Sequence, residues 1–261
     1  MSKLSERFIF TSKESEFTRH LKRPIILDKD SNYELGLLWF SCYNTIFNIT
    51  DKNNKFKIND QDKSITPGAY EVRNLSNELE RYGIELLANT NTSKCILKRI
   101  KYVNGDPTYI KIDNVIKPER LDVINPKQPT HYYIKNSKLE FSSTSFFCNI
   151  LGFDNSQFTN VEQEVTSINI INIIDLTSIN ICCNIIKGGY FDIEEENILY
   201  SFPINSVPFG YKILKEPFQV IYSSVNTDII QDLKFYIIDD FFKPINFNGE
   251  TITICVHLRQ V

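Results

Sequence analysis

The stretch TITICVHLR, Thr251–Arg259, decides the fold. Its apolar residues stand at every second position and alternate with mainly polar ones, as Ile252, Ile254, Val256 and Leu258 against Thr251, Thr253, Cys255, His257 and Arg259. Successive side chains of a β-strand point to opposite faces of the sheet. The stretch therefore predicts a strand with one face in a hydrophobic core.

The same alternation occurs earlier in the stretch SINICCNII, residues 178–186. One face would carry Ile179, Ile181, Cys183 and Ile185, and the other Asn180, Cys182 and Asn184. The Asn248-Gly249 pair before the last strand is the strongest short hairpin signal in the chain. The C-terminal third thus predicts a strand-rich, antiparallel region.

Other apolar runs bounded by turn residues extend this pattern. We expect strands at 33–46, 56–58, 69–72, 84–88, 95–97, 139–141, 198–200, 211–214, 218–222 and 233–238. Asn74 and Ser143 are N-cap residues for two short helices, which Gly83 and Gly152 would end. No long helices alternate with the strands, so the chain is predicted to be all-β, an antiparallel two-sheet sandwich with two short helices.

The chain is 261 residues long, within the range of one large β domain, although two smaller domains are also compatible with this length. Residues 1–32 are mixed in charge and lack a period, so we expect an N-terminal arm, followed by a domain over 33–261. Within this domain, residues 101–138 contain Asn104-Gly105 and four prolines, Pro107, Pro118, Pro126 and Pro129. So many residues that interrupt strands and helices predict a long surface insertion.

Composition excludes several classes of protein. Hydrophobic residues make up 42% and charged residues 23%, as in an ordinary globular domain, and the net charge of −3 gives no general attraction to nucleic acid or anionic lipid. The six cysteines form no C-x-x-C spacing, and we expect reduced, buried thiols. Met1–Arg7 bears charges where a signal peptide needs an apolar run, and no span of about 18 apolar residues exists. We expect synthesis in the cytoplasm and folding there or in the nucleus.

No arrangement of residues predicts catalysis. His20, His131 and His257 fall in the arm, the insertion and a strand, without a second ligand at metal-binding spacing. Lys187-Gly188-Gly189 opens no helix and is interpreted as a turn, and Glu194–Glu196 as a solvated loop. The aromatic residues, 13% of the chain, lie mostly in apolar runs and are assigned to core packing. We predict no catalytic, cofactor-binding or metal-binding residue, and no enzyme.

Several phrases of the sequence resemble the minor capsid, penton-like protein of Polinton/Maverick elements and adintoviruses. In chain order they are YELGLLWFSCYNTIFNIT (33–50), ITPGAYEV (65–72) with LSNELE (75–80), LLANTNTSKCIL (86–97), FSSTSFFCNILGF (141–153), IIKGGYFDIEEENILYSFPINSVPFGYKILKEPFQVIYSSV (185–225) and FNGETITICVHLR (247–259). The resemblance covers roughly 33–100 and 139–261. The chain departs from the family pattern at Phe47, where proline is expected, and in the length of 101–138.

The resemblance implies a single jelly roll that forms the fivefold vertices of an icosahedral shell of a double-stranded DNA virus or virus-like transposon. It implies self-association as a pentamer, contact with a major capsid protein, a place in the virion, and no cofactor. Outer loops would be the part available to a host receptor. Two alternatives stay open: a carbohydrate- or receptor-binding β-sandwich, including a domesticated capsid gene, and a jelly roll of the major capsid type.

Overall fold

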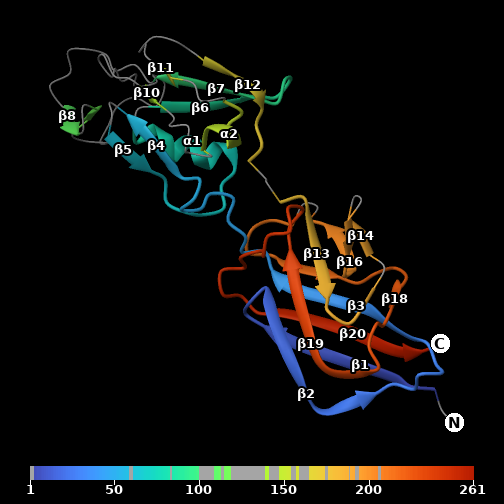
Figure 1. Cartoon of the computed structure of the whole chain (residues 1–261). Coiled ribbons are helices and arrows are strands. Elements are labelled where there is room, and N and C mark those ends of the chain that lie inside the picture. The colour runs from blue at the N-terminus through green and yellow to red at the C-terminus, as the bar shows by residue number, and fades with distance from the viewer. Residues whose placement is uncertain are drawn as a thin grey trace. The chain divides into compact units, whose positions relative to one another are not determined.

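The computed structural model describes residues 3–58, 61–82, 84–99, 109–112, 115–118, 139–140, 147–153, 157–158, 165–173, 176–187, 189–191, 194–204 and 207–261. The chain divides into two compact units, one formed by residues 1–46 and 176–261 and the other by residues 47–175 (Figure 1). The second unit is thus an insertion in the sequence of the first. Each unit has its own cluster of buried hydrophobic side chains.

The first sheet of the first unit, sheet A, has the strand order β1-β20-β3-β17. Its strands are β1 (Ser5–Ser12), β20 (Ile252–Gln260), β3 (Tyr33–Tyr43) and β17 (Lys212–Lys215), and β18 (Tyr222–Ser224) also pairs with β3. All pairs are antiparallel. One irregularity interrupts the register of β20 with β3, between Cys255 and Val256.

The second sheet, sheet B, has the order β16-β13-β19-β2 and is also antiparallel. It contains β16 (Ile198–Pro203), β13 (Ser178–Cys183), β19 (Ile229–Ile238) and β2 (Glu16–Ile26). A small hairpin, β14 (Gly189–Phe191) with β15 (Glu194–Glu196), lies between β13 and β16 in the chain. The acidic run 194–196 is therefore a strand, where the sequence predicted a loop.

If the separate β14–β15 hairpin is left out and β17 and β18 are counted as one edge strand, the unit has eight strands in chain order. Strands 1, 8, 3 and 6 form sheet A, and strands 2, 7, 4 and 5 form sheet B. This is the strand order of a jelly roll, in which consecutive strands cross between two packed sheets. The predicted all-β, two-sheet antiparallel sandwich with a single jelly roll is confirmed. It is built from 1–46 and 176–261, however, and not from a continuous 33–261.

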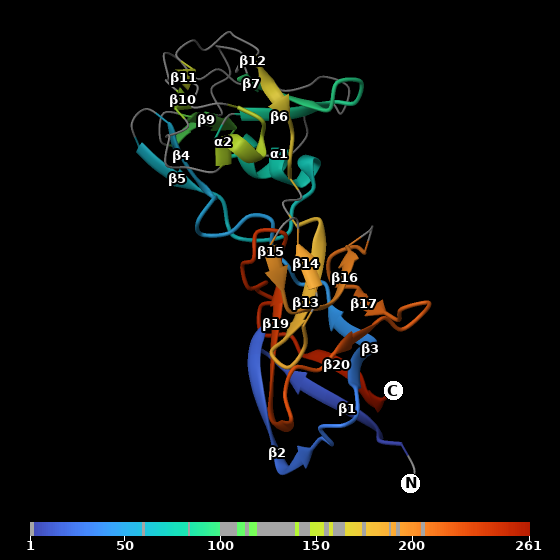
Figure 2. The same ribbon diagram turned by 45° about the vertical axis from the view of Figure 1, so that its right-hand side comes forward.

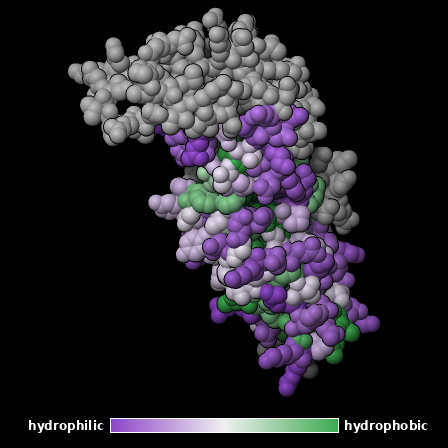
Figure 3. All heavy atoms as spheres, turned by 90° about the vertical axis from the view of Figure 1, so that its left-hand side faces the viewer, coloured by the Kyte–Doolittle hydropathy of each residue, from purple (hydrophilic) through white to green (hydrophobic). Residues whose placement is uncertain are grey.

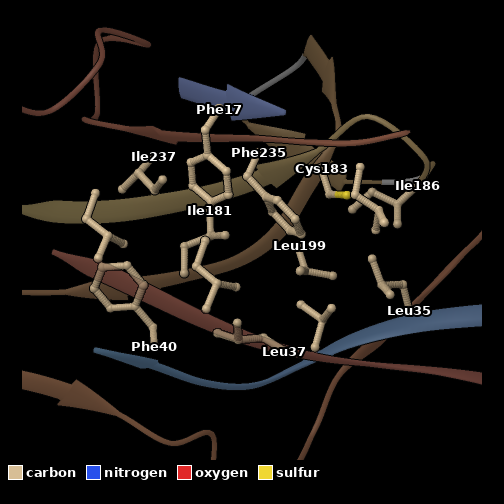
Figure 4. Close-up of a cluster of buried hydrophobic side chains, with 14 of the residues drawn as sticks. Phe17, Leu35, Leu37, Phe40, Ile181, Cys183, Ile186, Leu199, Phe235 and Ile237 are labelled. Atoms are coloured by element: carbon tan, nitrogen blue, oxygen red, sulfur yellow. The ribbon is translucent and has the colours of Figure 1, made fainter. Parts of the chain in front are cut away.

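The core of the sandwich lies between the two sheets, where side chains of both inner faces interdigitate (Figure 4). The predicted inward residues of the C-terminal strand, Ile252, Ile254, Val256 and Leu258, are all fully buried, as are Ile179, Ile181 and Cys183 of β13. Aromatic rings add to the packing: Phe40 lies 5.5 Å from Phe202, and Phe17 lies 5.5 Å from Phe235, measured between ring centroids.

The predicted N-terminal arm is wrong for most of its length. Residues 5–12 and 16–26 are β1 and β2, which pair with β20 and β19 (Figure 2). Phe8, Phe10 and Phe17 face the core, while the alternate positions carry exposed and mostly polar residues such as Arg7 and Glu16. Both strands are sheet edges, and edge strands carry charges that hinder unwanted pairing. Because these strands mix charged and apolar residues, their sequence does not reveal that they belong to the sandwich.

The second unit contains two small sheets, a hairpin and two helices. One sheet has the order β11-β10-β4-β5, the other β12-β7-β6. The strands are β4 (Lys55–Ile58), β5 (Gln61–Ser64), β6 (Ile84–Asn89), β7 (Lys94–Arg99), β10 (Leu139–Glu140), β11 (Gln157–Phe158) and β12 (Val165–Ile170), with β8 (Tyr109–Ile112) and β9 (Val115–Pro118) as the hairpin. Apart from this hairpin, the predicted insertion 101–138 lies outside the described residues. The insertion that the structure defines is longer, 47–175.

Two short helices form, as predicted. Helix α1 (Val72–Glu80) begins two residues before the predicted cap, Asn74, and Glu71 is its N-cap. Leu75 and Leu79 are fully buried in the core of the second unit. The strand predicted at 69–72 is absent from this described stretch, because Val72 already belongs to the helix. Helix α2 (Phe147–Ile150) is followed by Gly152 at φ +79°, while its predicted cap, Ser143, lies outside the described residues.

The Asn248-Gly249 turn forms as predicted, but it does not close a hairpin. Both residues have positive φ, +52° and +79°, and the Glu250 N–H donates to the Phe247 carbonyl at 3.1 Å. These are features of a type I′ turn. The preceding strand β19 lies in sheet B and the following strand β20 in sheet A. The turn therefore lies in the connection that leads from sheet B to sheet A.

Candidate functional site

The residues that the sequence singled out for chemistry do not come together. His20 is exposed on β2, where Nδ1 lies 2.5 Å from an Asp232 carboxylate oxygen, and His257 lies on β20 in the other sheet. His131 lies outside the described residues. Within the described part of the chain, no three His, Cys, Asp or Glu side chains are grouped as a metal site would require.

The cysteines of the described residues are poor nucleophiles. Five of them are buried: Cys42, Cys95, Cys182, Cys183 and Cys255. Burial raises the pKa of the Cys42, Cys95 and Cys183 thiols to about 12, so the reactive thiolate is scarce at neutral pH. The predicted reduced, buried thiols are confirmed for these five residues.

A polar network lies on the outer face of sheet A, on the side that β20 turns away from the core. Both ring nitrogens of His257 are engaged: Nε2 lies 2.9 Å from the Ser5 hydroxyl and Nδ1 lies 2.8 Å from the Tyr222 hydroxyl. The Arg259 guanidinium lies 3.5 Å from the centre of the Tyr222 ring and donates two hydrogen bonds to one carboxylate oxygen of Glu34, at 2.8 and 3.0 Å. The network therefore links β1, β3, β18 and β20.

The network requires a glycine beneath it. Gly36 of β3 pairs with Tyr222, and an added Cβ would lie 2.6 Å from Val220 Cγ1 and 2.9 Å from Tyr222 Cδ1. Only a residue without a side chain leaves room for this close approach. The packing fixes the Val220 and Tyr222 side chains over Gly36 on the outer face of sheet A.

A second polar cluster orders the loop that follows β19. The Asp240 carboxylate accepts hydrogen bonds from the backbone N–H and the hydroxyl of both Thr177 and Ser178. Burial alone would raise the pKa of this carboxyl, but the hydrogen bonds outweigh it and lower the pKa below its ordinary value. Phe242, in the same loop, has φ +60°, and Phe241 beside it is exposed. The cluster holds a strained turn in place.

Exposed apolar side chains are concentrated along β17 and its flanking segments, a region we call the β17 edge. It consists of Phe209, Tyr211, Leu214, Phe218 and Ile221, together with Tyr43 at the end of the paired strand β3, and Phe218 is fully exposed. β17 is an outermost strand of sheet A, and an edge strand presents backbone N–H and C=O groups that a further strand can pair with. Figure 3 shows a different face of this unit, on which hydrophilic side chains predominate and hydrophobic ones form small areas.

Sequence reasoning did not find these surfaces. The sequence placed His257 on the polar side of its strand, and the structure agrees. Nothing in the sequence indicated that Tyr222 and Glu34 lie near this histidine. Cross-strand register alone brings these residues together. An exposed Leu214 cannot be distinguished by sequence from a buried leucine in another strand.

The described chain is thus a single-jelly-roll protein whose notable surface features are a sheet edge and an outer-face network. No protein-family model matches the chain, and neither does any curated protein sequence. Among solved structures, the chain is similar to the crystal structure of the mavirus penton protein, with a TM-score of 0.48 and 10% identity, over 99% of this chain and 100% of that chain. The jelly-roll assignment itself follows from the strand order of this chain. None of the described helices is long and apolar enough to cross a membrane.

Proposed function

We propose that the chain is a structural capsid protein that acts by self-assembly, a penton-like vertex subunit of an icosahedral double-stranded DNA virus or virus-like transposon of the Polinton/Maverick and adintovirus kind. The observation that supports this most is the strand order of the sandwich, β1-β20-β3-β17 against β16-β13-β19-β2. Jelly rolls of this order serve viral capsids, lectins and cupins. The phrases that resemble the minor capsid family favour the first of these three classes.

The surface of the sandwich suits a protein whose function is association. The β17 edge exposes aromatic and aliphatic side chains on and beside an outermost strand of sheet A. Exposed apolar groups at such a place indicate an interaction site. In the proposed particle the chain would contact copies of itself as a pentamer, and a larger major capsid protein around that ring. We also propose that the chain catalyses no reaction, binds no cofactor and is located in the virion.

The segment that interrupts the jelly roll is proposed to project from the shell and to be the part available to a host receptor. The second unit has its own buried core, so its apolar residues do not complete that of the sandwich. A variant that lacks residues 101–138 should fold and assemble like the full chain. Loss of assembly on this deletion, with the sandwich still folded, would place the segment in the contacts between subunits.

A carbohydrate-binding β-sandwich is the second candidate. The exposed rings of Tyr211, Phe218 and Phe241 favour it, because sugars stack on aromatic faces. A glycan array separates the two candidates when combined with the mass of the purified protein. Binding of a defined glycan by a monomer supports the second candidate, whereas a ring-forming protein without glycan binding supports the capsid subunit.

The direct test of the proposed function is the native mass of the purified full chain. The vertex role predicts a pentamer, five times the chain mass. A trimer would point to a subunit of the major capsid type. A monomer at every concentration and salt condition would contradict the capsid function.

A further inference from the structure

We propose that copies of this chain associate by strand addition, with β1 of one copy pairing antiparallel with β17 of the next copy, so that sheet A continues across the contact. This inference depends on the proposed assembly function and specifies its partner surface. The observations behind it are the directions of the two edge strands of sheet A, the backbone groups that these strands direct outward, and the chemistry of their side chains.

The directions of the two edges are compatible. Sheet A is antiparallel throughout its order β1-β20-β3-β17, so the two outermost strands run in opposite directions. A second copy moved sideways along the sheet therefore brings its β1 antiparallel to β17. The contact joins two different surfaces, and such heterologous contacts can repeat around a closed ring.

The backbone groups that the contact needs point outward. The Gln260 N–H donates to the Leu4 carbonyl, so in the alternating antiparallel ladder Arg7 and Ile9 direct their N–H and C=O groups away from β20. In the same way, the Asn44 N–H donates to the Tyr211 carbonyl, which leaves the groups of Lys212 and Leu214 directed away from β3. The Thr11 carbonyl accepts a hydrogen bond from the Arg19 side chain, so one end of the β1 edge is already occupied.

The side chains match in one register. Ile9 faces outward opposite Cys255, and Leu214 faces outward opposite Ser41, so both lie on the outer face of sheet A. They are 53% and 56% exposed, which is high for apolar residues in strands. If Leu214 lies opposite Ile9 of the next copy, each of these side chains covers the other. This register also brings together residues whose backbone N–H and C=O groups both point outward, so hydrogen bonds can form between the strands.

The same register pairs opposite charges. Arg7 lies two residues before Ile9, and Glu216 two residues after Leu214, so the two become direct neighbours in the antiparallel pair. Both are exposed, and neither forms an ion pair within the described part of the chain. A shift by four residues, which would place Lys212 opposite Arg7, puts like charges together, which is unfavourable. A symmetric β1–β1 contact centred on Arg7 would oppose two arginines.

Charge reversal tests the register. The association of the full chain is followed by sedimentation velocity and native mass spectrometry for Arg7→Glu, Glu216→Arg and the double variant. Each single variant should weaken association about fivefold, the upper range for an exposed ion pair, and the double variant should restore it to about the wild-type value. Leu214→Asp should weaken association roughly tenfold or more, because a charge replaces a covered apolar side chain. Ile26→Asp is the matched control: this isoleucine is 79% exposed on sheet B, and its substitution should leave association unchanged.

The outcomes separate the inference from the proposed function. Weaker association of the single variants with restoration in the double variant supports the pairing. Wild-type assembly that is insensitive to Arg7, Glu216 and Leu214 overturns the pairing and leaves the capsid function intact. A symmetric dimer that Arg7→Glu does not affect also overturns it. A wild-type chain that never associates contradicts the function and the pairing together.

Discussion

Replacing Phe17 by alanine tests whether the N-terminal segment is part of the sandwich. Phe17 is 7% exposed, its ring centre lies 5.5 Å from that of Phe235, and the Arg19 guanidinium lies 4.8 Å above it. Removing a buried phenylalanine ring costs about 3–5 kcal/mol of stability, and the edge position of β2 favours the lower value, about 3 kcal/mol. A disordered arm predicts no loss.

Urea unfolding of the first unit is the assay for this variant. Trp39 is the only tryptophan of the chain and lies on β3, so its fluorescence reports on the sandwich without a contribution from the second unit. With a denaturant slope of about 2 kcal/mol per molar urea, Phe17→Ala should lower the midpoint by about 1.5 M. Ile9→Ala is the control, since this side chain is half exposed on the neighbouring edge strand, and its effect should stay below about 1 kcal/mol. Equal, negligible shifts for both variants would refute the placement of residues 16–26 in the core.

Three further predictions concern the sandwich. Gly36→Ala should destabilise it by about 1–3 kcal/mol in the same fluorescence assay, because the new Cβ meets Val220; an unchanged midpoint would contradict the close packing. The folded-state pKa of Asp240 is lowered, so its contribution to stability is present above about pH 4 and is lost as the pH falls through the folded pKa; Asp240→Asn should reduce this acid dependence in urea titrations at several pH values. Cys42 and Cys183 should resist iodoacetamide at pH 8 in the native protein and react only in urea, as peptide mapping would show, whereas native labelling would contradict their burial.

The β-sandwich could be predicted from strands that have one clear inner face. The alternation in 251–259 and 178–183 identifies the inner face correctly, because β20 and β13 are central strands with neighbours on both sides. In β13 the opposite face is buried as well, at Asn180 and Cys182, which the alternation does not indicate. For the edge strands β1 and β2, the prediction of an N-terminal arm was wrong. In β2 only alternate residues reach the core and the others meet water, so Glu16, His20 and Lys22 resemble the charges of a disordered terminus.

The division into two units could not be predicted from the same signals. The strands expected at 56–58, 84–88 and 95–97 do form, but their side chains enter the core of the second unit. An alternating pattern indicates that one face of a strand is buried, but it does not indicate which other element covers that face. The Asn248-Gly249 turn illustrates the same limit, since its local geometry was predicted and the sheets that it connects were not.

The outer-face network and the β17 edge depend on register, which sequence does not specify. Tyr222, His257 and Arg259 meet because β18 and β20 both pair with β3 in one alignment. A shift of one residue would turn these side chains to the opposite face of the sheet. Their grouping follows from the tertiary fold.

The measurement that tests the central claim most directly is the mass of the purified full chain by native mass spectrometry across a range of concentrations. A self-assembling vertex subunit predicts a stable pentamer that weakens when the β17 edge is altered at Leu214. A monomer at every concentration, in a protein whose Trp39 fluorescence shows a folded sandwich, would contradict the proposed assembly function.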